Sequence, residues 1–384
     1  MSAGGPVRVR ALSFHARYRC GHSGACCSSG WTIPVEPAVA ARIDAGAASG
    51  ELRGWDGSVV RDWAGPIPAA GEAPATAARV ALRTLPGGAC VFFDARGTRL
   101  CAVQLRLGEG ALPFSCRHFP RVVTLTPLGV SVTLSHYCPT AAGLVVAAPA
   151  EPVRVVEGPS AFPSSWPFEG LDARAALPPS LRPGVLATWE SFERWEEDAV
   201  ATLTRSPSPE EALAELAARA ERVRRWTPAD GGFDTFFAAR LAESGVAPSG
   251  VAPRAGLADW RLVASTAFAP GLLPPAPPEI EGRAEEWVAA GWAQLAPAVS
   301  RWLAAKAFGS WLALHAEGLR TTVLGLRVAL GVLRAEAARG CVEAGRALDA
   351  ELLAQALRRA DLLLVHLADP EALAARLSRC ETAC

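Results

Sequence analysis

The sequence predicts a mainly α protein with a cysteine-rich, irregular α+β N-terminal domain and an all-α C-terminal domain. Seven of the ten cysteines fall within the first 138 residues, and the next one is Cys341. Short β-like runs and turns surround the first group, whereas helical periodicity dominates from residue 185 onward. We therefore place a cysteine-cluster domain at 1–157, a proline-rich connection at 158–184 and a helical domain at 185–384.

Composition limits the partners that the chain can have. Its 384 residues suffice for two or three compact units. The 38 basic and 38 acidic residues cancel, so no global field attracts nucleic acid or an acidic membrane surface. The N-terminal segment lacks the apolar run of a secretory signal, and the apolar stretch at 321–335 is interrupted by Arg327. We expect a cytoplasmic protein, where clustered cysteines more often bind metal or do redox chemistry than form stable disulfides.

Turn formers organise the N-terminal domain. Residues 89–104 are typical of two short β-like runs joined by a turn at 94–97. Residues 121–138 are typical of a hairpin that turns at 127–129, because β-branched residues flank a proline and a glycine. Pro139 is suited to the first position of a helix, which would put Cys138 at its N-cap.

The C-terminal half has strong helix boundaries. Ser208 and Glu211 have capping-box spacing ahead of an amphipathic run that should end before Pro228. Residues 227–282 are broken by proline and glycine, which suggests a surface wrap or a second linker. From residue 283 the pattern is helical, with a kink expected at Pro297 and a new helix starting at Asp369 and Pro370.

Thiolate sulfur is the protein ligand that zinc and iron-sulfur clusters prefer, because it is soft and strongly donating. The spacing lacks the C-x2-C pairs of a zinc ribbon, so it predicts one metal site assembled from several loops. Adjacent side chains diverge in extended backbone, so only one of the paired cysteines would face a given metal. The candidate ligands of this metal-binding domain are Cys20, Cys26, Cys27, Cys90, Cys101, Cys116 and Cys138.

Other residues near the cysteines could either support a metal site or have an ordinary packing role. Glycines 24 and 30 would let the backbone approach a cluster closely. Trp31 would be an apolar lid or an ordinary core side chain, and His118 would be an additional ligand or a neighbour. Arginines beside Cys116 would offset the charge of an anionic cluster. No role is assigned to Cys341, Cys380 and Cys384.

Four segments of the chain resemble the YkgJ-type cysteine-cluster proteins, described as a zinc- or iron-chelating family, and in particular their flagellin lysine-N-methylase branch. These segments are "YRCGHSGACCSSGWTI", "CVFFDARGTRLCAVQ", "GEGALPFSCRHFPRVV" and "SVTLSHYCPTAA". The resemblance covers residues 14–146, and the helical half is similar more loosely, including "RRADLLLVH" near its end.

The resemblance implies a [4Fe-4S] cluster and transfer of a methyl group from S-adenosylmethionine to a lysine of a protein substrate such as a flagellin-like protein. Family members carry one more cysteine before the CC pair, where this chain has His22 and Ser23. No glycine-rich nucleotide motif or radical cysteine triad is present, and no residue is assigned to catalysis.

Two alternatives remain open at the level of sequence. The first is a structural or interaction protein stapled by zinc, since a four-thiolate zinc site supplies ~10–16 kcal/mol of apparent binding energy to folding. The second is a redox relay that uses the excess thiols as reversible disulfides. Metal and sulfide content would separate all three.

Overall fold

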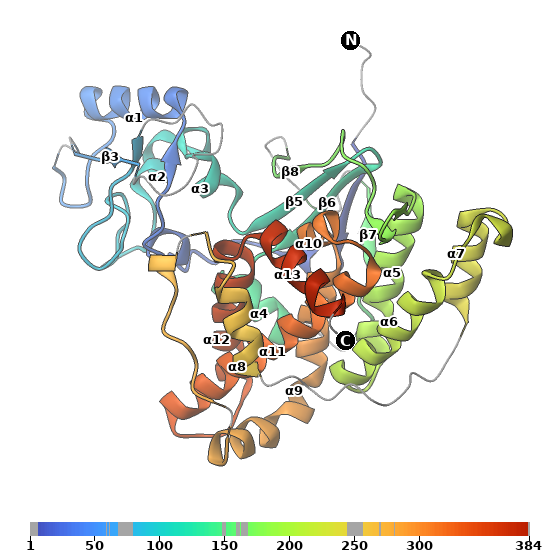
Figure 1. Cartoon of the computed structure of the whole chain (residues 1–384). Coiled ribbons are helices and arrows are strands. Elements are labelled where there is room, and N and C mark those ends of the chain that lie inside the picture. The colour runs from blue at the N-terminus through green and yellow to red at the C-terminus, as the bar shows by residue number, and fades with distance from the viewer. Residues whose placement is uncertain are drawn as a thin grey trace, which may run out of the picture. The chain divides into compact units, whose positions relative to one another are not determined.

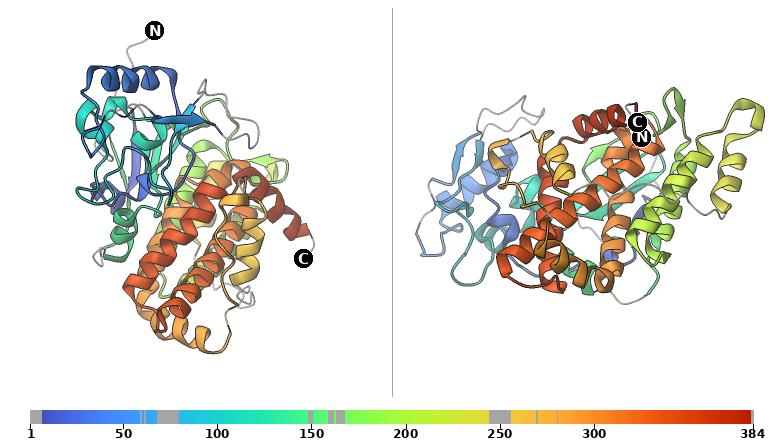
Figure 2. Two further views of the ribbon diagram at one scale, coloured as in Figure 1. Left: turned by 90° about the vertical axis from the view of Figure 1, so that its left-hand side faces the viewer. Right: turned by 60° about the horizontal axis from the view of Figure 1, so that its bottom comes forward.

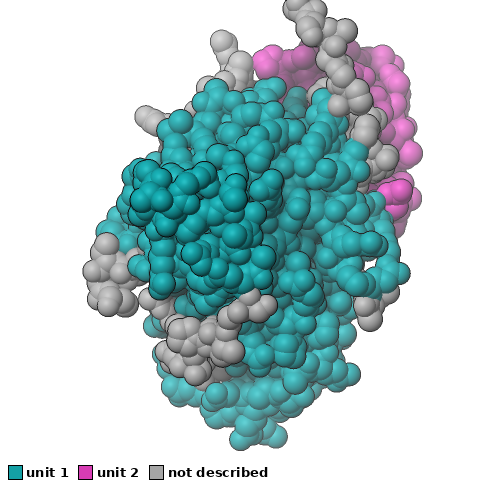
Figure 3. Space-filling model, turned by 90° about the vertical axis from the view of Figure 1, so that its right-hand side faces the viewer, with its two compact units in different colours: residues 1–18, 121–137, 141–384 teal, residues 19–120, 138–140 magenta. Residues whose placement is uncertain are grey.

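The computed structural model describes residues 7–58, 60, 62–67, 80–147, 151–158, 162, 168–243, 256–268, 270–279 and 281–382. The chain divides into two compact units, shown in different colours in Figure 3. Unit 1 contains residues 1–18, 121–137 and 141–384, and unit 2 contains residues 19–120 and 138–140. The fold is mainly helical, as predicted (Figure 1). None of the described helices is long and apolar enough to cross a membrane.

Unit 2 is built from short elements around a small core. Its sheet has the order β2-β4-β3, and all pairs are antiparallel. The core beneath contains Ile43, Leu52, Trp63 and Phe92. The elements are a 3-10 turn η2 (Ala25–Cys27), β2 (Pro34–Val35), α1 (Pro37–Ser49), β3 (Ala64–Pro66), β4 (Val80–Leu82), α2 (Ala102–Leu107), η3 (Glu109–Ala111) and α3 (Phe114–His118).

Unit 1 contains a five-stranded sheet in the order β7-β1-β6-β5-β8. Strand β1 pairs parallel with β6 and antiparallel with β7, while β5 and β6 form a hairpin. The strands are β1 (Val9–Leu12), β5 (Arg121–Thr126), β6 (Gly129–Leu134), β7 (Val155–Glu157) and β8 (Leu171–Asp172), and a separate ribbon pairs β9 (Ser180–Arg182) with β10 (Val185–Leu186).

Helices of unit 1 share one large core with this sheet. The long helices α9 and α11 lie side by side, with α8 and α12 against α11 (Figure 2). Trp302 and Phe308 are fully buried in this core. The helices are α4 (Pro139–Ala147), α5 (Trp189–Arg205), α6 (Pro209–Val223), α7 (Phe233–Ala242), α8 (Gly256–Ala264), α9 (Arg283–Ala307), α10 (Trp311–His315), α11 (Leu319–Ala344), α12 (Ala350–Asp361) and α13 (Pro370–Thr382); η1 (His15–Arg17), η4 (Pro228–Asp230) and η5 (Pro270–Leu272) are 3-10 turns, and η6 (Leu362–Leu367) is π-helical.

Several predicted boundaries are confirmed by their local chemistry. The Ser208 hydroxyl accepts from the Glu211 amide at 3.1 Å and caps α6, which ends before Pro228. The Asp369 carboxylate accepts two amides of the first turn of α13. Helix α4 begins at Pro139, and the hairpin turns between β5 and β6 as expected. Pro297 lies inside α9, which continues to Ala307.

Other expectations differ from the structure. The predicted β-like runs on either side of residues 94–97 reduce to isolated bridges at Cys90 and Cys101, although the turn itself forms around the Asp94 carboxylate. Residues 227–282 contain helices α7 and α8, because buried Phe237 and Trp260 anchor them in the large core. Parts of the predicted connection at 158–184 lie outside the described residues.

The boundaries of the compact units also differ from the predicted domain boundaries at 157 and 185. The C-terminal helices are not an all-α unit, since they share their core with Leu12 of β1 and form one compact unit with β5 and β6. Buried Arg10 of β1 explains part of this arrangement, because its guanidinium donates to Glu196 of α5 at 3.0 Å. A buried cation requires such a partner, and helix α5 supplies it.

Candidate functional site

The paired cysteines of unit 2 lie on a tight turn that glycine makes possible. Gly24 has φ +72°, and a β-carbon there would lie 2.2 Å from Cζ of Phe93. The amides of Cys27 and Ser28 both donate to the Gly24 carbonyl, which closes η2. The turn brings the sulfurs of Cys26 and Cys27 within 3.8 Å of each other, so the two side chains do not diverge as the sequence suggested.

Backbone pairing holds two further cysteines next to this turn. The Cys90 amide donates to the Cys27 carbonyl at 2.7 Å. Cys101 lies directly before α2, and its backbone forms an isolated β-bridge with Phe93. Phe93 follows Cys90 by three residues, so the bridge brings the segments of Cys90 and Cys101 together. Cys27, Cys90 and Cys101 therefore come from three separate segments that hydrogen bonds bring together.

The thiols influence one another strongly. Hydrogen bonding with the Cys27 sulfur lowers the pKa of Cys101 to about 7 and also lowers the pKa of Cys26. The same hydrogen bonds, together with burial, raise the pKa of Cys27. Burial raises the pKa of Cys90 to about 12 and that of Cys116 well above its ordinary value. Two sulfurs thus favour the thiolate form and three oppose it.

Cys116 completes this group from α3, because the sulfurs of Cys90, Cys101 and Cys26 each contribute to its raised pKa. We call Cys26, Cys27, Cys90, Cys101 and Cys116 the thiol cluster. All five are partly buried in unit 2.

The other two predicted ligands belong to a second part of unit 2. Cys20 is exposed, and its sulfur accepts the amide of His22 at 3.4 Å, with Nδ1 of that histidine 4.0 Å away. Cys138 is buried directly before α4. A β-carbon on Gly21 would lie 2.8 Å from Oγ1 of Thr140, so the segment that carries Cys20 passes the first turn of α4.

The residues of unit 2 fit a thiolate-bound metal in the chemistry of their donors. Five soft sulfur donors from four segments lie together, and their pKa values show that uncompensated thiolates are costly there. Within the described ranges, however, no group of three or more metal-ligating side chains converges closely enough to hold an ion. A bound metal would require the sulfurs to draw together.

The neighbouring residues have mixed positions. Trp31 meets Phe119 edge-on at 5.9 Å and is partly buried, which agrees with either of its two interpretations. His118 is buried against the ring of Phe114, with ring centroids 4.4 Å apart. His22, in the place of the family's additional cysteine, is exposed with φ +49°. Arg99 donates to the carbonyl of Ser23.

A second polar cluster, in unit 1, was not assigned a site by sequence reasoning. Oδ2 of Asp361 accepts the His136 amide at 2.6 Å and its Nδ1 at 3.0 Å. Oδ1 of the same carboxylate contacts Nζ of Lys306 at 2.7 Å and accepts Nε1 of Trp302 at 3.0 Å. Burial alone would raise the pKa of Asp361, but Lys306 and His136 outweigh it and hold that pKa far below its ordinary value.

Two more buried side chains extend this cluster. Nε2 of His136 lies 3.1 Å from Nε2 of His15, and Nδ1 of His15 lies 3.3 Å from Oγ1 of Thr133. Burial is the main cause that lowers the pKa of both imidazoles. We call these residues the Asp361 network: His15, Thr133, His136, Trp302, Lys306 and Asp361.

Nearby, Ser135 and His366 form a second contact between the same two segments. Oγ of Ser135 lies 2.6 Å from Nε2 of His366, which belongs to η6. The motifs "SHYC" and "RRADLLLVH" contain Ser135, His136, Asp361 and His366, and Lys306 is the only lysine of the sequence. An isolated lysine in an apolar helix was a usable indication that a buried carboxylate pairs with it.

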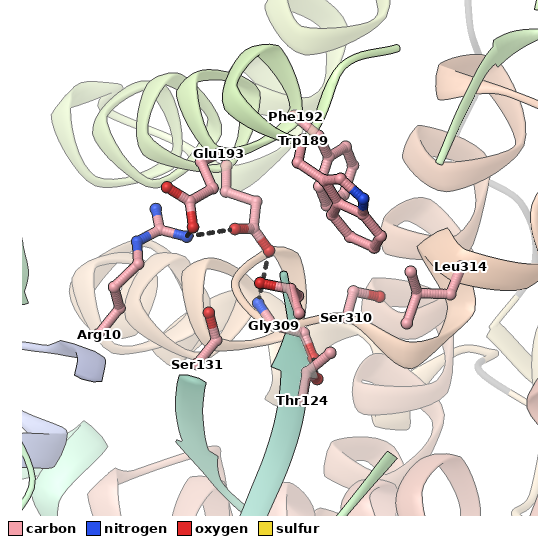
Figure 4. Close-up of a pocket in the computed structure, with 11 residues that line it drawn as sticks. Arg10, Thr124, Ser131, Trp189, Phe192, Glu193, Gly309, Ser310 and Leu314 are labelled. Atoms are coloured by element: carbon pink, nitrogen blue, oxygen red, sulfur yellow. Dashed lines mark hydrogen bonds and ion pairs between the residues drawn. The ribbon is translucent and has the colours of Figure 1, made fainter. Parts of the chain in front are cut away.

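A small cavity of unit 1 lies between α5 and the segment after α9 (Figure 4). Arg10 and Glu196 form one wall, and Glu196 also accepts the Gly309 amide at 2.8 Å. Trp189 and Phe192 form another wall. The enclosed volume of about 20 Å³ is enough for a water molecule but not for an organic ligand.

No family model matches the chain, and no curated protein or solved structure matches it either. The resemblance to the cysteine-cluster proteins therefore stays a prediction from the residues that carry it.

Proposed function

We propose that this chain binds a metal centre through thiolates of unit 2, and that the centre is a [4Fe-4S] cluster. The observation that carries the proposal is the thiol cluster, in which five cysteines from four segments lie together although they span residues 26–116. A protein gains little from gathering five partly buried thiols unless a cation compensates them, because the thiolates of Cys27, Cys90 and Cys116 are otherwise costly. The choice of iron over zinc comes from the resemblance.

The ligand set would be drawn from this cluster. Cys101 and Cys26 already favour the thiolate form, so they are the first ligands that we expect. The remaining ligands would come from Cys27, Cys90 and Cys116, since a bound cation reverses the effect of burial on a thiol. When bound, the cluster would supply electron transfer or substrate ligation. Methyl transfer from S-adenosylmethionine to a protein lysine rests on the resemblance alone, so the proposal is confined to metal binding.

Metal and sulfide content of anaerobically purified protein tests the proposal. We expect iron and acid-labile sulfide in equal amounts, near the ~4 of each that a [4Fe-4S] cluster contains. Stoichiometric zinc without sulfide would contradict the [4Fe-4S] assignment and support the alternative of a structural protein stabilised by zinc. Metal-free protein whose number of free thiols falls under mild oxidant would support the redox relay and overturn metal binding.

Variants connect the metal to the thiol cluster. Cys27→Ser and Cys101→Ser should each remove most of the iron, because each replaces a candidate thiolate ligand of the cluster with a hydroxyl. Cys341→Ala is the matched control, since Cys341 is a buried thiol of α11 in unit 1. Iron loss in all three variants would mean that the iron is bound nonspecifically.

A further inference from the structure

The two histidines of the Asp361 network face each other through the same ring atom. Their Nε2 atoms are 3.1 Å apart, and both side chains are fully buried. Each histidine comes from a different segment of unit 1, His15 from η1 and His136 from the residues after β6. What lies between two such nitrogens depends on where the ring protons are held.

The proton of His136 is held at Nδ1. An ionised carboxylate can only accept hydrogen bonds, and Oδ2 of Asp361 lies 3.0 Å from this atom. The ammonium group of Lys306 contacts the other carboxylate oxygen at 2.7 Å and stabilises the ionised form of Asp361. Nε2 of His136 is therefore the unprotonated nitrogen of the neutral ring.

The position of the His15 proton depends on the Thr133 hydroxyl, whose oxygen lies 3.3 Å from Nδ1 of that ring. In a continuing helix the Ala305 carbonyl of α9 would accept the amide of Gly309, four residues later. Here the Gly309 amide donates to Glu196 instead, at 2.8 Å. The Thr133 hydroxyl donates to the Ala305 carbonyl at 3.4 Å and takes the place of that amide. The hydroxyl oxygen then accepts from Nδ1 of His15, which leaves Nε2 of His15 unprotonated as well.

Two unprotonated nitrogens thus face each other at 3.1 Å in a buried site, an arrangement that a cation between them would stabilise. Metal-ligating histidines typically give their second ring nitrogen to a carboxylate or another acceptor, as both rings do here. With Zn–N bonds of ~2.05 Å, a 3.1 Å separation corresponds to an N–Zn–N angle of about 98°. An increase of roughly 0.25 Å in the separation would make the angle tetrahedral.

We propose that His15 and His136 are the two protein ligands of a second metal site, for a divalent ion of the zinc class, with Asp361 and Thr133 orienting the rings. This site lies wholly in unit 1 and uses no cysteine, so it is independent of the proposed thiolate centre. Two protein ligands leave the remaining positions of a tetrahedral ion to water or to a small ligand.

Zinc content of the full-length chain tests this site. Metal-free wild-type protein, His15→Gln and His136→Gln are equilibrated with zinc, freed of loose metal and assayed for zinc per chain. Each variant should hold one zinc fewer than the wild type. His315→Gln is the matched control, because His315 is exposed on α10, and it should match the wild type. Equal zinc in all four proteins would overturn the proposal.

X-ray absorption at the zinc edge provides a readout that does not depend on the folding of the histidine variants. It is best measured on a Cys27→Ser, Cys101→Ser double variant, in which the thiolate centre is disabled. Imidazole scattering from about one zinc per chain is the expected result. A zinc-free double variant whose 15N spectrum shows one proton shared between the rings would identify a hydrogen bond in place of the metal and overturn the proposal.

Discussion

The thiol cluster of unit 2 and the Asp361 network of unit 1 both hold several titratable side chains away from water. In unit 1 the charges are complementary, since Lys306, Trp302 and His136 donate to a single carboxylate. In unit 2 the five side chains are all of one kind, and the thiolates of Cys26 and Cys101 are stabilised by a neighbouring thiol and by backbone amides, with no cationic side chain among the causes in the described part of the chain. The comparison teaches that the buried carboxylate of unit 1 is compensated by its own neighbours, whereas the buried sulfurs of unit 2 have, within the described ranges, no cationic side chain among them and would be compensated by a bound metal.

The largest expected effect is that of removing the carboxylate at the centre of the Asp361 network. Asp361→Ala would leave Lys306, Trp302 and the His136 amide without an acceptor in a buried site. Breaking such a group typically costs about 3–5 kcal/mol, measurable by urea unfolding of the metal-free protein. Asp349→Ala at the start of the same helix is the control, since it removes the N-cap of α12 and an exposed ion pair with Arg346 and should cost about 1–2 kcal/mol. Similar losses in both variants would contradict the comparison.

Acidification should weaken unit 1 through His366. Burial lowers the pKa of this imidazole to about 4, against an ordinary value near 6.5. Between these values the unfolded chain binds a proton that the folded chain does not, so stability falls as the pH falls from ~6.5 to ~4. The contribution reaches up to ~3 kcal/mol.

Urea unfolding of wild type and His366→Asn across this pH range checks the point. The variant should show a flatter dependence, whereas His315→Asn at the exposed end of α10 should follow the wild type. Parallel curves for all three proteins would show that His366 is not the group responsible.

The turn that carries the paired cysteines allows a test in unit 2. Gly24→Ala and Gly57→Ala both place a side chain at positive φ, +72° and +81°, which costs ~1 kcal/mol or more. Only the first also forces a β-carbon against Phe93, which adds about 1–3 kcal/mol of overpacking. We expect Gly24→Ala to reduce both stability and iron content, and Gly57→Ala to retain its iron. Equal iron content in the two variants would show that the turn at Gly24 is not required for metal binding.

The smallest effect is expected for a thiol in metal-free protein. Cys27→Ser should change the free energy of unfolding by less than ~1 kcal/mol, since a hydroxyl replaces the thiol as a donor. In metal-loaded protein the same change should lower stability by several kcal/mol, because the bound metal stabilises only the folded state. Equal losses in both forms, compared by urea unfolding, would show that the thiols already satisfy one another.

Sequence reasoning succeeds here where the determining contacts are local. The Ser208 side chain caps α6 by accepting the amide of Glu211, only three residues later in the chain. Pro139 begins α4, and a turn with a proline and a glycine joins β5 to β6. It fails where the contacts are distant. Strand β1 pairs with β6 across some 120 residues, and that pairing moves the sheet into the helical unit. The clustering of cysteines was visible from their number, whereas the pairing of His136 with Asp361 depends on packing that no local pattern encodes.

Lys306 has a practical consequence for labelling experiments. It is the only lysine of the sequence, and its ammonium group is held by Asp361 against the ring of Trp302. Among side chains, reagents that acylate primary amines can therefore modify this one position, and they do so only when the amine leaves its carboxylate. The rate of acylation would report the opening of unit 1 at a single atom, without any engineered probe.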